Sequence, residues 1–126
     1  MKVKISELSG KALDWAVAMA LGGKILTLDG MVAAIRVGSC QFVVVLPCDA
    51  SNYHPSTNWD QCGNLIEAED IEFKWVSDAT LEAHSYLHDP HYGYGLTHQE
   101  AACRLIVASK LGDEVDIPDE LMEVGE

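Results

Sequence analysis

The sequence contains no long hydrophobic run. Its longest apolar stretch, FVVVLP at residues 42–47, suits a buried strand and is too short to span a membrane. The N-terminal segment MKVKISELSG has lysines but no apolar core behind them, so we expect no signal peptide. The predicted location is the cytoplasm, without membrane contact.

Basic residues are scarce. The chain has 8 Lys and Arg against 20 Asp and Glu, which gives a net charge of −12. The imbalance lies after residue 47, where 3 basic residues accompany 17 acidic ones. Such a surface repels phosphate backbones, so direct nucleic-acid binding is not expected. The acidity fits a basic protein partner, mimicry of a nucleic acid, or solubility alone.

Paired cysteines and catalytic motifs are also missing. The 4 cysteines have no CxxC spacing, and we expect mostly buried free thiols in a reducing compartment. No nucleophile elbow, phosphate-binding loop, dinucleotide fingerprint or metalloprotease signature is found in the sequence. We therefore predict no cofactor and no catalytic residue, and the chain is more typical of a binding protein than of an enzyme.

The hydrophobic periodicity predicts two helices. Apolar residues recur at helical spacing over about residues 10–21, after Ser9 as a candidate N-cap. A second helix is predicted over residues 98–111, because Thr97 and Glu100 form a capping box at its start. Both segments are followed by glycine, which commonly ends a helix.

Strand patterns lie between the two helices. Two apolar runs flank Asp29-Gly30, a strong hairpin signal, and CQFVVVLP supplies a third strand. IEFKWV at residues 71–76 alternates like a half-buried strand, whereas residues 77–96 look irregular. We predict one α+β domain over residues 1–126, with a small antiparallel, hairpin-rich sheet packed against two helices. The acidic segment 113–126 is expected to dock only in part.

The stretch NYHPSTNWDQCGN, residues 52–64, has the composition of a loop but contains two large aromatic rings. Its proline fixes one turn, and the small polar residues that follow can bond to nearby backbone. The aromatic rings can anchor both ends by burial. A structural plug and a recognition site share this composition, so both interpretations stay open. The candidate binding residues are Tyr53, Ser56, Thr57, Asn58 and Trp59.

A histidine cluster is the remaining chemical candidate. His84, His88 and His91 are spaced four and three apart. On one helix face they could bind Zn²⁺ or another transition metal, but Pro90 interrupts such a helix before the third ligand. The pattern is more typical of a polar surface loop that is rich in histidine. The three histidines are kept as weak candidate ligands, and no metal is predicted.

Three segments resemble one known family. They are MKVKISELSGKALDWAVAMALG, YHPSTNWDQCGNLIE and EAACRLIVASKLGDEVDIPDEL, which together span both ends and the middle of the chain. In these segments the chain resembles the NinX-like proteins of temperate bacteriophages and prophages. The family usually has Gly-Gly-Pro-Ile-Ile where this chain has Cys-Gly-Asn-Leu-Ile at residues 62–66. The resemblance implies a phage accessory protein of unknown biochemical role, made in the cytoplasm of the bacterial host cell. It supplies no reaction, cofactor or catalytic residue.

Three hypotheses for function follow. The first is a non-enzymatic binding factor that acts on a host or phage macromolecule, most naturally a protein, with Asp113–Glu123 as a second surface. The second is capture of a nucleotide signal, in which Arg36, Arg104 or Lys74 would meet the phosphates. The third is a metal-dependent enzyme built on the histidine cluster. The sequence does not indicate an oligomeric state.

Overall fold

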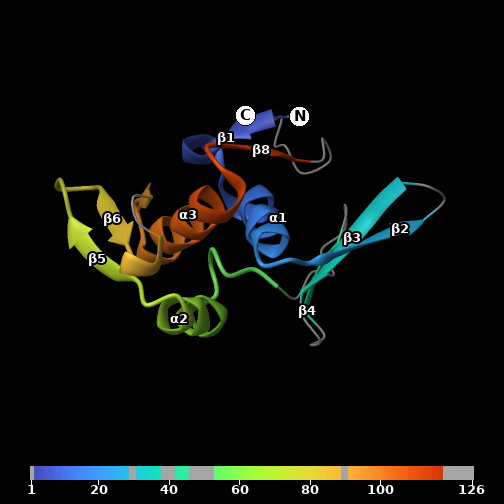
Figure 1. Ribbon diagram of the computed structural model, residues 1–126, viewed down its shortest axis with the longest axis horizontal. Helices are drawn as coiled ribbons and strands as arrows, with labels where there is room; N and C mark the ends of the chain where they lie inside the picture. The colour runs from blue at the N-terminus through green and yellow to red at the C-terminus, as the bar shows by residue number, and fades with distance from the viewer. Residues whose placement is uncertain (1, 29–30, 38–41, 46–52, 89–90, 118–126) are drawn as a thin grey trace.

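Three helices and three small antiparallel sheets make up the described part of the chain (Figure 1). The computed structural model describes residues 2–28, 31–37, 42–45, 53–88 and 91–117. The helices are α1 (Gly10–Ala20), α2 (Trp59–Ala68) and α3 (His98–Leu111), with 3₁₀ turns η1 (Ile5–Glu7) and η2 (Tyr86–His88). The strands are β1 (Lys2–Lys4), β2 (Lys24–Leu28), β3 (Met31–Val37), β4 (Phe42–Val45), β5 (Glu72–Trp75), β6 (Leu81–His84), β7 (Tyr92–Gly95) and β8 (Glu114–Asp116). The predicted α+β class is confirmed.

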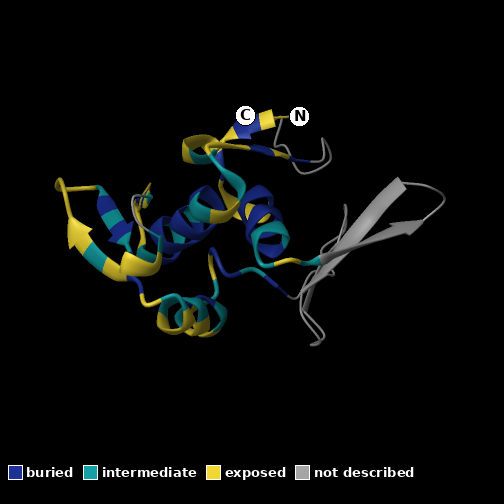
Figure 2. Ribbon diagram, viewed as in Figure 1, coloured by how far each residue is buried: buried dark blue, intermediate teal, exposed yellow. Residues whose placement is uncertain are grey.

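Helices α1 and α3 pack together at the centre of the core, and both were predicted. Most residues of both helices are buried, and many of these are alanines, whose small side chains allow close packing (Figure 2). The side chain of Thr97 caps α3 by accepting a hydrogen bond from the Glu100 N–H. Gly22 and Gly112 follow the two helices with φ of +80° and +96°, a conformation that favours glycine.

Strands β2, β3 and β4 form the predicted antiparallel meander. Leu28 pairs with Met31, so a two-residue connection joins β2 and β3; Asp29 and Gly30 themselves lie outside the described residues. Figure 1 shows this sheet extending away from α1 on the side opposite the β5–β7 sheet. The meander and the β5–β7 sheet are separate antiparallel sheets.

Strands β5, β6 and β7 form an antiparallel sheet that packs against α3. The contact is close because β7 presents glycines to the helix. A Cβ atom added at Gly93 would overlap the backbone of Ala101 and Leu105. Residues 77–96, predicted to be irregular, thus contain two strands, and their glycines and tyrosines alternate between the helix and solvent.

The two ends of the described chain lie side by side. Strand β8 pairs with β1, with Asp116 opposite Lys2 and Glu114 opposite Lys4, an arrangement of opposite charges that favours pairing. Val115 is buried, so the start of the acidic segment 113–126 is docked, while residues 118–126 lie outside the described ranges. None of the helices described is long and apolar enough to cross a membrane.

Candidate functional site

Residues 53–56 are packed into the protein and do not form an open loop. Tyr53 and Ser56 are buried, and Pro55 between them is among the most enclosed side chains. The Ser56 N–H donates a 2.9 Å hydrogen bond to Oδ1 of Asp14, a buried carboxyl on α1. This half of the 52–64 stretch therefore holds the chain against α1.

The carboxyl group of Asp14 is electrostatically unusual. Burial raises its pKa from 3.8 to about 6, although hydrogen bonds from Ser56 and the nearby His54 act in the opposite direction. Burial also raises the pKa of the Tyr53 hydroxyl far above its usual value. Neither group is exposed to a ligand in solvent, so the geometry gives both a structural role.

The second half of the stretch begins a helix that the sequence analysis missed. Asn58 is the N-cap of α2, and its Oδ1 accepts a 3.0 Å hydrogen bond from the Gln61 N–H. Oε1 of Gln61 in turn accepts a 2.7 Å hydrogen bond from the His54 N–H. Thr57 and Trp59 are left on the surface. Of the five candidate binding residues, these two are exposed, while Tyr53, Ser56 and Asn58 hold the structure.

Helix α2 is attached to α3 through a pair of thiols. Cys62 is the one buried residue of the described helix α2, and it lies against Cys103 of α3. A hydrogen bond between the two thiols lowers the pKa of Cys62 and raises that of Cys103. Both are free cysteines, as predicted; Cys40 and Cys48 lie outside the described residues.

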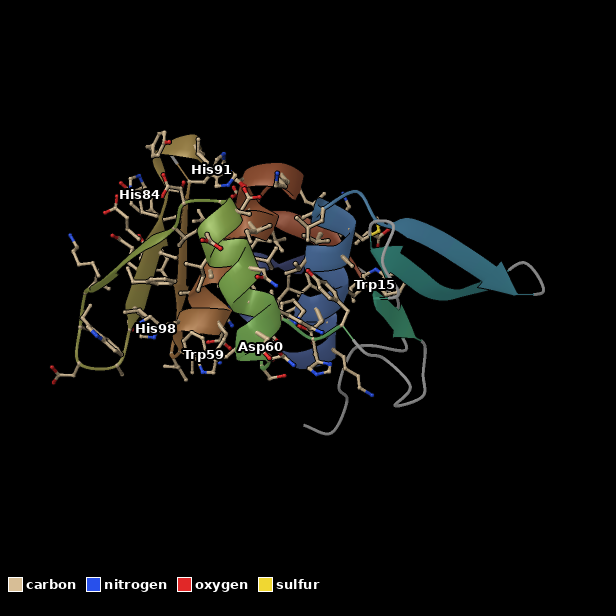
Figure 3. All side chains as sticks on the ribbon, turned by 90° about the horizontal axis from the view of Figure 1, so that it is seen from below. Trp15, Trp59, Asp60, His84, His91 and His98 are labelled. Atoms are coloured by element: carbon tan, nitrogen blue, oxygen red, sulfur yellow. The ribbon has the colours of Figure 1, made fainter. Side chains whose placement is uncertain are left out.

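Four rings from three elements, α2, β5 and α3, gather beside the start of α2. His98, the first residue of α3, lies 5.9 Å from Trp59, 4.8 Å from Phe73 and 6.4 Å from Trp75, measured between ring centroids. We call these four residues the aromatic strip. Figure 3 shows Trp59 and His98 on the same side of the molecule, with Asp60 beside Trp59.

The aromatic strip is largely open to solvent. Trp59 and Trp75 are each 57% exposed, and Leu96, two residues before His98, is 69% exposed. Phe73 and Trp75 share the face of β5 that looks toward α3, since they lie opposite the buried Ala83 and Leu81 of β6. Because α3 begins only at His98, its body does not cover Trp75. Neighbouring exposed tryptophans are more typical of a binding surface than of a surface that only serves the fold.

The opposite face of the β5–β7 sheet carries a second aromatic group. Tyr92 stacks on His84 at 4.9 Å and on Tyr94 at 6.4 Å. The Tyr94 hydroxyl donates a 3.2 Å hydrogen bond to Glu82. The contacts of Tyr92 with His84 and of Tyr94 with Glu82 follow the pairing of β6 with β7. Tyr92 and Tyr94 are two residues apart on β7 and so share one face of the sheet.

The three histidines of the predicted cluster are used separately. His84 stacks on Tyr92, whereas Nε2 of His88 lies 2.6 Å from a carboxylate oxygen of Glu69. His91 begins the approach to β7. Within the described residues no group of three His, Cys, Asp or Glu side chains is placed to hold a metal ion.

A small pocket lies between η1, β7 and α3. Its volume is about 180 Å³, below the usual range for ligand sites, and it is lined in part by Tyr92, Tyr94 and Arg104. The guanidinium of Arg104 donates to the backbone oxygens of Leu8 and Tyr94 and pairs with Glu100 at 3.4 Å. These contacts occupy Arg104, one of the three residues that the nucleotide-capture hypothesis names for phosphate.

Sequence reasoning found Trp59 but missed the other three residues of the aromatic strip. Phe73 and Trp75 were predicted only as strand residues, and His98 was given no partner. They meet Trp59 through the packing of α2 and the sheet around α3, which no local pattern reveals. The available signal was Asn58 followed by Asp60 and Gln61, which marks a helix start and would have placed Trp59 on a helix.

The fold and this surface define a small, acidic α+β protein with a solvent-exposed tryptophan pair. A family model described as Bacteriophage P22, NinX matches residues 4–110, which include all three helices except Leu111. The chain belongs to this phage protein family, and the resemblance seen in the sequence is confirmed. A search of curated proteins finds no match.

Proposed function

We propose that this phage protein is a non-enzymatic accessory factor that binds a host or phage macromolecule through the aromatic strip. The observation that carries the proposal is the pair Trp59 and Trp75, each more than half exposed and both within ring contact of His98. Tryptophan is enriched at the centres of protein interfaces, where its burial on binding contributes much of the affinity.

The remaining described features support binding over catalysis. Asp14, the titratable carboxyl with a strongly raised pKa, is enclosed by Ser56 and α1 and is used to hold the chain. The 52–64 stretch positions part of the aromatic strip. The hydrogen bonds of Asn58 and Gln61 fix the first turn of α2, and this turn orients Trp59. Thr57, exposed next to them, lies at the edge of the same surface.

The test is affinity capture from phage-infected cells with three forms of the tagged protein. The forms are the wild type, the double variant Trp59→Ala, Trp75→Ala, and the control Tyr86→Ala. Tyr86 is 66% exposed and lies in η2, so the control removes an equally accessible ring from another part of the surface. Thermal melting of all three should agree closely, because truncation of exposed side chains changes stability little.

We expect a macromolecule that is recovered with the wild type and the Tyr86 variant but lost with the tryptophan variant. Recovery of the same molecules by all three folded forms would contradict the proposal, because binding would then not involve the strip.

A further inference from the structure

We infer that the aromatic strip accepts a basic, extended segment of a protein partner, with an arginine or lysine side chain lying over the indole rings. The inference rests on the proposed function and adds the chemistry of the partner. It is carried by the charges around the strip, considered together with the exposure of its rings.

The rings provide a surface that attracts cations. The rings of Trp59 and Trp75 lie 5.9 and 6.4 Å from the ring of His98, and both tryptophans are open to solvent. The face of an indole carries negative electrostatic potential, and tryptophan is the best aromatic partner for a guanidinium or ammonium group. A flexible cationic side chain can reach such a face from an extended backbone.

Two exposed acidic residues lie close in the chain to the tryptophans of the strip. Asp60 directly follows Trp59 in α2 and is exposed (Figure 3). Asp78 is exposed in the turn that follows β5, three residues after Trp75. Each carboxylate can pair with a cation that approaches the neighbouring indole, and the net charge of −12 attracts basic chains at longer range.

The three basic residues that follow residue 47 do not pair with Asp60 or Asp78 in the described part of the chain. Lys74 lies between Phe73 and Trp75 on β5, so its side chain belongs to the opposite face of the sheet. It stands opposite Glu82 in the register of β5 with β6. Arg104 is held by Leu8, Tyr94 and Glu100. Lys110 lies in the last turn of α3, at the end away from His98.

One feature of the site favours an anion instead. Helices α2 and α3 both begin at the strip, and helix N-termini attract negative charge. Here each first turn already contains a carboxylate, Asp60 in α2 and Glu100 in α3, and each cap already accepts a backbone N–H. The local acids and the overall charge therefore favour a basic partner over a phosphate-bearing one.

The experiment measures binding of a fluorescein-labelled peptide of alternating arginine and glycine by anisotropy, at physiological salt. A glutamate–glycine peptide and a labelled single-stranded oligonucleotide serve as the other two probes. The strip variants are Trp59→Ala with Trp75→Ala, and Asp60→Asn with Asp78→Asn. The matched control, Glu7→Gln with Glu114→Gln, removes two exposed acids near η1 and β8, at the opposite side of the molecule in Figure 1.

We expect the wild type to bind the arginine peptide and neither of the other probes. Loss of both indoles should weaken binding about tenfold, from two cation–π contacts of ordinary strength. The Asp60, Asp78 variant should bind severalfold more weakly than the Glu7, Glu114 control. Equal weakening in the strip and control variants would overturn the inference, because binding would then be unspecific charge attraction. Binding of the oligonucleotide in preference to the peptide would overturn it as well.

The outcome can be separated from that of the proposed function. If capture from infected cells depends on the two tryptophans while the arginine peptide does not bind, the strip is a binding surface and the inferred partner chemistry is wrong. If neither experiment depends on the tryptophans, the proposed function fails together with the inference.

Discussion

At the scale of single residues, Asp14 is the group whose surroundings most affect its chemistry. It is 4% exposed and accepts a hydrogen bond from the Ser56 N–H, while burial raises its pKa to about 6. The folded protein therefore binds this proton more tightly than the unfolded chain. The resulting stabilisation is complete below the unfolded pKa of about 4 and is lost as the pH rises through about 6.

The variant Asp14→Asn should remove this pH dependence. The amide oxygen of asparagine can still accept from Ser56, and it carries no charge. Between pH 7 and pH 5, protonation of Asp14 should stabilise the wild type by about 1 kcal/mol more than the variant. Urea unfolding of both proteins at the two pH values measures the difference. An identical pH response in both would show that Asp14 is ionised in the folded protein throughout this range.

At the scale of elements, Gly93 sets the distance between β7 and α3. Because a Cβ atom there would overlap backbone atoms of Ala101 and Leu105, the Gly93→Ala variant must separate the strand from the helix. We expect a loss of stability of about 3 kcal/mol, at the upper end of the range for overpacked cores. Denaturant unfolding monitored by circular dichroism provides the measurement.

The matched glycine for comparison is Gly63 in α2. A Cβ atom there would meet nothing within 4 Å, and the residue lies inside the helix. The variant Gly63→Ala should therefore raise the free energy of unfolding by about 0.5–1 kcal/mol through helix propensity alone. If Gly63→Ala destabilised the protein as strongly as Gly93→Ala, the close approach of β7 to α3 would not explain the result at Gly93.

Some helices and strands could be predicted from the sequence and others could not. Helices α1 and α3 and the β2–β4 meander were predicted, because caps, glycine stops and a hairpin signal are local. Helix α2 was missed because Gly63 and a run of polar residues resemble a loop, and β6 and β7 were missed because β7 uses glycines where it meets α3. The aromatic strip could not be predicted, since its rings are brought together by packing between distant parts of the chain.

At the scale of the whole molecule, the excess of acidic residues should affect how strongly ions quench the fluorescence of the tryptophans. Trp15 is 2% exposed, whereas Trp59 and Trp75 are open. The measurement uses variants that each keep one of the three tryptophans. At low salt, we expect acrylamide to quench the fluorescence of Trp59 and Trp75 strongly and that of Trp15 weakly. Caesium should quench the exposed pair more effectively than iodide, relative to free tryptophan, because the acidic surroundings attract cations.

Reversal of the ion order, with iodide the better quencher, would indicate that helix N-termini dominate the field at the strip. That result would also weaken the inference of a basic partner, and it requires no knowledge of the partner itself.

The attachment of α2 has a consequence for the motions of the protein. Cys62 is the one buried residue of this described helix, whereas α1 and α3 each bury many. We expect α2 to open locally without global unfolding, so that its backbone amides exchange with deuterium faster than those of the other two helices. Trp59 moves with α2 while Trp75 stays with the sheet, so the spacing of the two indoles can adjust. Slower exchange in α2 would then report partner binding across the strip.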